Sequence, residues 1–453
     1  MNLRAARERK LLHTLLPLTD DSYSPCILKQ MTLSRVLLAL FCAAALAPAS
    51  GASAQPGVTA VLPNGREIHP AGNWIPLAPY PFALAVRPDG AQVAAPSIGF
   101  PFALNVVDGP ADDRPTVRRM PPGEDNDPHI EVHAGLVYSP DGSMLYVATG
   151  DSGKVCAYRT SDWKTAGEVP LDGPLGGKDY KGSFAATLVI SADGHTLFAL
   201  DQGNWRIVVL DATRLERIAS IPTGRYPFGL ALSPGGMRLY VTNTGLFEYT
   251  TIPGASVKDP AGTGLHFPPF GYPSMQAREG TVAQGKRIPG LGDENSTEGS
   301  SLWTYDVSDR ARPAVTAKLR LGATITAARG QQTVGGAAPT GGAAQDDAVF
   351  VALAHEDQVV KISADGTRLL AQAELSPFSG PRFQDSEGRP LRGVMPSGLA
   401  VRDRRVYVAE SGINAVGVLD AATMQVVEHI PAGWNPSALG FSGSLQKTEF
   451  RVR

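Results

Sequence analysis

The chain alternates short apolar runs with tight polar turns, and one such unit recurs along its length. A representative copy is IPTGRYPFGLALSPGGMRLYVTN, residues 221–243. The apolar run Leu230–Leu232 predicts a strand, and Leu239–Val241, rich in β-forming residues, predicts a second one. Between them, Ser233–Gly236 predicts a tight turn, because proline presets φ and glycine accepts a positive φ.

Similar units recur at a spacing of roughly 50 residues, which is typical of repeat proteins built from short strands. The pattern therefore predicts an all-β chain folded as a seven-bladed β-propeller. Four further copies of the unit are Phe82–Gly90, Leu136–Val147, Leu188–Ala199 and Ser397–Val408.

The repeat also predicts where each blade lies. The last blade is expected to be composite, with outer strands from residues 58–77 and inner strands from the C-terminal end, so that no open sheet edge remains. Whether this last blade is complete is left open by the sequence. The predicted blades are Pro79–Val117, His129–Leu171, Ser183–Ile221, a fourth opening at Phe228 with its third strand at Leu302–Asp306, Leu321–Leu375, Gly393–Ile430, and a seventh beginning at Ser437–Phe441.

Two segments interrupt the repeat. Residues 244–300 form a long insert rich in glycine, proline and aromatic residues, either a functional lid or a disordered loop. Gly335–Ala344 is low in complexity, and we expect it to be flexible.

The N-terminal region predicts export. Residues 31–54 have the features of a signal peptide: Met31, the basic Arg35, the apolar core Val36–Leu46, and an A-x-A cleavage site ending at Ala54. The apolar core is too short to span a membrane. We therefore expect a periplasmic or secreted protein without a membrane span. Residues 1–30 are expected to be a mis-assigned upstream start, and residues 58–453 the propeller.

Composition excludes some functions and assigns none. With 41 Lys and Arg against 43 Asp and Glu, the chain has a formal net charge of −2, which gives no reason to expect a nucleic-acid partner. Cys156 is the only cysteine after the signal peptide, and we expect it to be structural and buried. No GxSxG, phosphate-binding loop or CxxC motif is present, so no catalytic residue and no cofactor are assigned.

Propellers bind ligands at one mouth of the central channel, and polar and aromatic residues fall in the loops expected there. The ligand is either a small molecule or a partner protein. The alternative for any single polar residue is that it bonds its own turn backbone. The candidate ligand-binding residues are Arg225, Tyr226, Asp201, Asn243, His355, Glu410, Asn414 and Trp434.

Two further groups of ionisable residues carry no metal assignment. His129, Glu131 and His133 share one face of a predicted strand, but a fourth ligand is not identifiable. The acidic group Asp293, Glu294 and Glu298 is expected to be solvated.

Several stretches resemble a known family. Arg392–Ala400, Val408–Asp420 and His429–Trp434, together with Leu62–Arg66 and Ser301–Asp306, are similar to the propeller half of bacterial proteins that join a YncE-like (YVTN-repeat) β-propeller to an alkaline-phosphatase-like phosphoesterase domain. The similarity covers residues 58–442. In that family the phosphoesterase domain follows the propeller, and this chain contains no residues that match its metal ligands.

The resemblance therefore implies a binding or scaffold module that is not itself catalytic. The alternative, from analogy to other propellers, is a metal-dependent lactonase-like hydrolase with its metal held by Glu410, Asp201 and His355.

Overall fold

The computed structural model describes residues 60–61, 67–99, 103–120, 135–250, 252–256, 258–265, 271–272, 274–325, 335–386, 388 and 391–442. The chain divides into two compact units, Met1–Glu67 and Ile68–Arg453. In the first unit the described residues are Ala60–Val61, which form β1, and Glu67, which begins β2 (Glu67–Ile68). The remaining description concerns the second unit.

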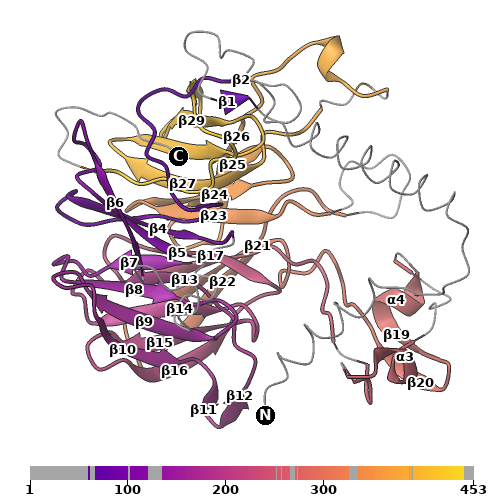
Figure 1. The fold of residues 1–453 in the computed structure, drawn as a ribbon. Helices are drawn as coiled ribbons and strands as arrows, with labels where there is room; N and C mark the ends of the chain where they lie inside the picture. Colours follow the sequence, from indigo (N-terminus) through magenta and orange to yellow (C-terminus); the bar gives the residue numbers. More distant parts are fainter. Residues whose placement is uncertain are drawn as a thin grey trace, which may run out of the picture. The chain divides into compact units, whose positions relative to one another are not determined.

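The second unit contains six four-stranded antiparallel sheets, whose strands follow one another along the chain except that β19 (Gly280–Ala283) and β20 (Lys286–Pro289) lie between the second and third strands of one sheet (Figure 1). These sheets are the blades of a β-propeller, and the predicted all-β propeller fold is confirmed. Blades one to three are β3 (Ala85–Val86), β4 (Gln92–Ser97), β5 (Ala103–Asp108) and β6 (Thr116–Met120); β7 (Leu136–Tyr138), β8 (Met144–Ala148), β9 (Lys154–Arg159) and β10 (Thr165–Pro170); and β13 (Ala185–Ile190), β14 (Thr196–Asp201), β15 (Arg206–Asp211) and β16 (Glu216–Pro222). Blades four to six are β17 (Pro227–Leu232), β18 (Arg238–Asn243), β21 (Ser301–Asp306) and β22 (Ala314–Arg320); β23 (Pro339–Ala344), β24 (Ala348–Leu353), β25 (Gln358–Ser363) and β26 (Leu369–Glu374); and β27 (Pro396–Arg402), β28 (Arg405–Glu410), β29 (Ala415–Asp420) and β30 (Val426–Pro431).

The core lies between the blades. Strand β24, with the sequence AVFVAL, is buried at all six positions because neighbouring blades cover both of its faces. Between blades three and four, for example, Phe198 and Ile207 pack with Val241 and Trp303. The fourth strands face solvent on one side and alternate instead, as β26 does with buried Ala373 between exposed Gln372 and Glu374.

The predicted count of seven blades is wrong: the described residues form six four-stranded blades. Residues 436–441, expected to open a seventh, run in extended form beside the inner strand of blade six, where a Cβ on Gly398 would meet Ser437 O and Ala438 Cα. On the other side Ser437 Oγ donates a 2.7 Å hydrogen bond to Phe82 O, next to blade one. This single segment therefore fills the inner-strand position between blades six and one without a second strand to pair with.

The predicted outer strands of that blade also do not form a sheet. Residues 69–80 form no regular strand, and their ends are tied by hydrogen bonds from Ala71 N to Pro431 O (2.9 Å) and from Ala78 N to Asn105 Oδ1 (3.2 Å). They run from the end of blade six to blade one, as the predicted closure required. They are not hydrogen-bonded into a sheet, because among the described residues no strand lies between them and residues 436–441.

Short elements are inserted between and within the blades. The hairpin of β11 (Gly173–Leu175) and β12 (Lys178–Tyr180) follows blade two, and a one-turn 3₁₀ helix, η1 (Pro381–Phe383), precedes blade six. The 244–300 insert holds α3 (Pro260–Thr263), α4 (Met275–Glu279) and the hairpin of β19 (Gly280–Ala283) and β20 (Lys286–Pro289). The expected flexibility of Gly335–Ala344 is wrong for its second half, which is the inner strand β23 of blade five.

Other predictions fall outside the described residues. They include the upstream segment 1–30, the signal peptide 31–54 and the group His129, Glu131 and His133. Within the described part of the chain, no helix combines the length and apolar character needed to cross a membrane.

Candidate functional site

Four inner strands and the 436–441 segment begin in the same way, with a residue of positive φ followed by a proline. We call this pair the entry step, and its proline the entry proline. The residue before the entry proline has a positive φ of 45–60° in each case, which is uncommon for a residue other than glycine and costs on the order of 1–3 kcal/mol. Its recurrence shows that the step is part of the architecture. These residues are Tyr80 (φ 55°), Tyr226 (φ 49°), Ala338 (φ 49°), Met395 (φ 51°) and Asn435 (φ 55°), followed by Pro81, Pro227, Pro339, Pro396 and Pro436.

Hydrogen bonds place successive entries beside one another on one rim. Thr340 Oγ1 donates to Ser397 O (3.3 Å), and Ser397 Oγ donates to Pro436 O (3.3 Å). Ser437 Oγ completes the series with its bond to Phe82 O. Each of these groups lies within one residue of an entry proline. The entries of blades five, six and one and the 436–441 segment therefore form a continuous rim, which blade four joins because Thr242 Oγ1 of that blade donates to Thr340 O (2.6 Å).

Large side chains on these entries are exposed to solvent. Tyr80 is 69% exposed, Tyr226 49%, Met395 51% and Trp434 57%. Folding gains little from apolar surface that stays in water, so these side chains are not explained by the stability of the propeller. Tyrosine, tryptophan and methionine are enriched at protein interfaces, and we call these four residues the rim cluster.

The predicted polar residues behave differently from the rim cluster. Asp201, Asn243 and Glu410 end the second strands of blades three, four and six, and all three are 0% exposed. Asn243 Nδ2 donates to Ser301 Oγ (3.3 Å) in its own blade, and its Oδ1 is buried with no hydrogen-bond partner among the described residues. These side chains are thus turned into the blades and do not line an open mouth.

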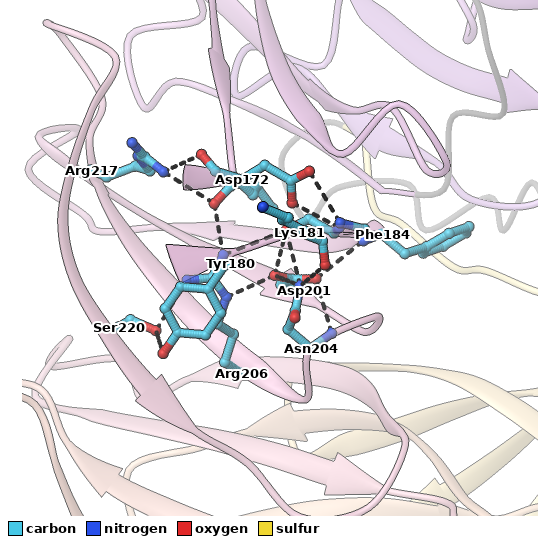
Figure 2. Close-up of polar contacts among 12 residues, drawn as sticks. Asp172, Tyr180, Lys181, Phe184, Asp201, Asn204, Arg206, Arg217 and Ser220 are labelled. Carbon is cyan, nitrogen blue, oxygen red and sulfur yellow. Dashed lines mark hydrogen bonds and ion pairs between the residues drawn. The ribbon is translucent and has the colours of Figure 1, made fainter. Parts of the chain in front are cut away.

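Asp201 is the centre of a buried polar cluster (Figure 2). It accepts hydrogen bonds from Ser183 Oγ (2.8 Å), Phe184 N (3.1 Å) and Asn204 Nδ2 (3.1 Å). It also forms an ion pair with Arg206, whose Nε lies 2.7 Å from Asp201 Oδ2 while the Arg206 side chain is 2% exposed. Donors from four residues saturate this carboxylate, which makes it a structural group.

The Arg206 guanidinium fills a slot between blades two and three. Its Nη2 donates to the carbonyl oxygen of Leu171, which directly follows blade two (2.7 Å). Its Cζ lies 3.4 Å from the ring centroid of Tyr180, which belongs to the β11–β12 hairpin (Figure 2). The charge is thereby held between a carboxylate, a backbone carbonyl and an aromatic face, each of which favours a buried guanidinium.

Glu410 has a different partner in blade six. Its Oε2 lies 2.8 Å from Nδ1 of His429 on the fourth strand, across the intervening β29. Burial raises the pKa of Glu410, and the hydrogen bond from His429 opposes that rise. The hydrogen bond to Glu410 raises the pKa of His429 above its ordinary value, although partial burial opposes it. A carboxyl and an imidazole with displaced pKa values can exchange a proton, but this pair lies inside one blade.

Arg225 holds the insert onto the propeller. Its Nη1 donates to Leu246 O (2.6 Å) and to Asp293 O (2.8 Å), at the two ends of the insert. Its backbone N donates to Glu298 O (2.6 Å). Arg225 is 7% exposed, so the structure assigns its guanidinium to packing and not to an open ligand site.

The remaining two predicted polar residues lie close to the rim. Asn414 (φ 58°) accepts a hydrogen bond from Asn435 N on its Oδ1 (3.0 Å), so it positions the entry step next to Trp434. His355 is exposed, and its Nδ1 lies 3.2 Å from Gly336 O. Of the eight predicted residues, Tyr226 and Trp434 thus present exposed side chains on the rim and Asn414 supports it.

The three proposed metal ligands do not form one site. Asp201 is bound to Arg206 in blade three, and Glu410 to His429 in blade six, while His355 belongs to a loop of blade five. Within the described residues, no group of three or more His, Cys, Asp or Glu side chains is arranged to hold a metal ion.

Other expectations have clear outcomes. Cys156 is buried on β9, as predicted. The acidic insert residues are paired and not merely solvated: Glu294 lies 3.3 Å from Arg278 Nε, and Glu298 lies 2.9 Å from Lys318 Nζ. Met395 was not predicted as a rim residue. It could have been identified from the proline that follows it, because a proline also follows residues 80, 226, 338 and 435 at the start of three other inner strands and of the 436–441 segment.

Comparisons with known proteins extend to the fold only. No protein-family model matches the sequence, and no curated protein matches it either. Among solved structures, a functionally unknown protein from Desulfotomaculum acetoxidans DSM 771 has a TM-score of 0.50 and 14% identity, with coverage of 80% of this chain and 89% of that chain. The periplasmic gluconolactonase PpgL of Pseudomonas aeruginosa has a TM-score of 0.50 and 16% identity, with coverage of 80% and 88%. At these identities, the likeness concerns the propeller fold alone.

Proposed function

We propose that this chain is an exported, non-catalytic binding module that recognises a protein partner through the rim of inner-strand entries. The observation that carries the proposal is the rim cluster: Tyr80, Tyr226, Met395 and Trp434 stay exposed at the entries. Aromatic and methionine side chains of this kind supply the central contacts of protein interfaces. Their rigid backbone lowers the entropy lost on binding.

The resemblance of the repeat to YncE-like propellers suggests the partner. In that family the propeller accompanies an alkaline-phosphatase-like phosphoesterase domain, so we propose such a domain as the protein bound at the rim. The signal sequence over residues 31–54 supports export to the periplasm or beyond. The chain would then position a substrate or an enzyme without reacting itself.

The test is a binding titration. A purified phosphoesterase domain of the resembled family is titrated into the wild-type propeller and into a triple variant, Tyr80→Ser, Tyr226→Ser and Trp434→Ser. We expect the variant to lose at least about 100-fold in affinity, because interface anchors of this type contribute about 2 kcal/mol or more each. Exposed Tyr249 in the insert (74% exposed) provides the control, Tyr249→Ser, which should bind as the wild type does.

Three results would contradict the proposal. The first is no binding by the wild type, and the second is an equal loss of affinity in Tyr249→Ser and the triple variant. The third is hydrolysis of a simple lactone by the wild type that is lost in Glu410→Gln, which would make the protein an enzyme. Thermal melting of all variants verifies that they fold.

A further inference from the structure

A polar pocket opens between blades four and five. It encloses about 410 Å³. Its floor is apolar, with Leu321, Leu353 and Val360, whereas its walls carry two arginines, two glutamates and two glutamines. The polar lining residues are Arg320, Glu356, Gln358, Gln372, Glu374 and Arg392.

Strand register shows that this pocket is the counterpart of the Arg206 slot. In blade three, Arg206 pairs with Pro222 and Val208 with Ser220; in blade five, Gln358 pairs with Glu374 and Val360 with Gln372. The preceding blades also end alike, with Leu171 N donating to Gly153 O and Leu321 N to Ser300 O. Gln358 of blade five therefore occupies the position equivalent to Arg206 of blade three, and Leu321 occupies the position equivalent to Leu171.

The two slots differ in what fills them. In blade three the Arg206 guanidinium occupies the slot, covered by Tyr180 and bonded to Asp201 and Leu171 O (Figure 2). In blade five the shorter Gln358 side chain turns away to Glu374, to which its Nε2 donates a short hydrogen bond. Gly322 follows Leu321 and has no side chain to fill the space. In the blade-five slot Arg320 Nη1 donates to Leu321 O (2.9 Å), the carbonyl that corresponds to Leu171 O, and the space beside Glu356 and Glu374 remains a cavity.

Acceptors suited to a cation line this cavity. Glu356 Oε1 accepts from Ala323 N (2.7 Å), and Glu374 Oε1 accepts from Gln358. In the described part of the chain, the second oxygen of each carboxylate accepts no hydrogen bond from the protein. At the rim of the pocket Arg392 donates through Nη1 to His355 O (2.6 Å), which leaves its Nε and Nη2 for an anion.

We propose that this pocket binds a small guanidino acid, with the guanidinium between Glu356 and Glu374 and the carboxylate on Arg392. The lining is balanced, with two positive and two negative side chains, which suits a zwitterion better than a simple cation or anion. A planar guanidinium can bond carboxylate oxygens in pairs, which gives geometric specificity as well as attraction. The site is separate from the proposed partner surface and does not depend on it.

Calorimetric titration with 4-guanidinobutanoate tests the site. The analogue 4-ureidobutanoate keeps the carboxylate but has an uncharged urea group, so it should not bind detectably, because it lacks the positive charge that the two glutamates attract. Glu374→Gln should lower the affinity for 4-guanidinobutanoate at least about tenfold, as expected when a charge-assisted hydrogen bond is lost. Glu428→Gln, the same charge change at an exposed residue of β30, is the matched control and should leave the affinity unchanged.

A second variant tests the other end of the ligand. Agmatine has the guanidinium but an amine in place of the carboxylate, so it should bind about tenfold more weakly than 4-guanidinobutanoate. Arg392→Gln should abolish that preference. The proposal is overturned if 4-guanidinobutanoate fails to bind at about 10 mM, a concentration at which even millimolar affinity is detected. It is also overturned if Glu374→Gln and Glu428→Gln bind equally, or if the preference over agmatine persists in Arg392→Gln. Glu374 and Arg392 are both exposed, so these variants are expected to fold, and thermal melting verifies it.

Discussion

Replacing Asp201 by asparagine tests the structural role of the buried ion pair most sharply. The change keeps the size of the side chain and removes its charge. It leaves Arg206, which is 2% exposed, without its carboxylate. The substituted amide would retain one acceptor oxygen for the donors that now surround the group, from Ser183, Phe184, Asn204 and Arg206.

The magnitude follows from burial. Removing one partner of a buried ion pair costs about 3–5 kcal/mol, because the remaining charge stays desolvated. For the roughly 340 residues that the structure describes, the entropy of unfolding is about 0.7 kcal/mol/K, so this loss lowers Tm by about 4–7 °C. The exposed pair Lys154–Glu168, 2.8 Å apart, provides the contrast. Breaking it with Glu168→Gln should cost less than about 1 kcal/mol.

The assay is urea unfolding followed by tryptophan fluorescence, with calorimetry for Tm. A third variant, Asp201→Asn with Arg206→Met, removes the stranded guanidinium. It should recover part of the stability lost in Asp201→Asn alone, because an apolar side chain replaces an unpaired charge. The account is contradicted if Asp201→Asn is as stable as Glu168→Gln, or if the double variant is no more stable than Asp201→Asn alone.

Three further predictions address other contacts. Tyr180→Leu should destabilise the protein by about 1–2 kcal/mol, measured by urea unfolding, because Arg206 loses a desolvated cation–π contact; an unchanged midpoint would refute this. The Tm of the wild type should exceed that of His429→Gln by the full amount below about pH 6.5, and the difference should shrink as pH rises through the raised pKa of His429. The reason is that a raised pKa stabilises the folded protein only while the imidazole is protonated. A Tm difference that grows with pH would contradict this prediction. Gly229→Ala should lower stability by about 1–3 kcal/mol, because its Cβ would press on Thr340 O of the adjacent inner strand; Gly235→Ala, with open space around it, should not, and equal effects would refute the close approach.

Much of the fold follows from local sequence. The turns Asp141–Gly142 and Asp193–Gly194 connect strands where predicted, because glycine supplies the positive φ (71° and 75°) that each turn requires. Hydrogen bonds from Ser139 and the Ser143 backbone and side chain also lower the pKa of Asp141 to about 2. Apolar middle strands such as β24 are equally visible, since burial on both faces leaves a continuous hydrophobic run.

Strand β23 was missed because its composition has no strand signal. Its glycines and alanines serve close approach between inner strands: a Cβ on Gly341 would meet Ser397 O of the next blade. Small residues are selected there by a neighbour more than 50 positions away in sequence. The blade count failed for a related reason, because Pro436-Ser437 has the sequence of an inner-strand entry and takes that position without the rest of a blade.

The candidate site was predicted in part. A polar residue at the end of a second strand looks the same in the sequence whether its side chain faces the central channel or is buried between two blades. For Asp201 the deciding partners are Arg206 and the surroundings of Leu171, which no local pattern identifies. The exposed aromatic residues Tyr226 and Trp434 were found because a loop with an aromatic residue before or within the repeated proline step recurs. Their role as a binding surface stays a prediction.

Hydrogen–deuterium exchange of the wild-type propeller, free and bound to the phosphoesterase domain, tests the proposed rim interface most directly. The account predicts slower exchange on binding in the entry segments around Tyr80, Tyr226, Met395 and Trp434. It predicts no change in the turns at the other end of the inner strands, such as Asp141–Gly142 and Asp193–Gly194. Protection confined to those turns, or no protection in the entry segments at saturating partner, would contradict it.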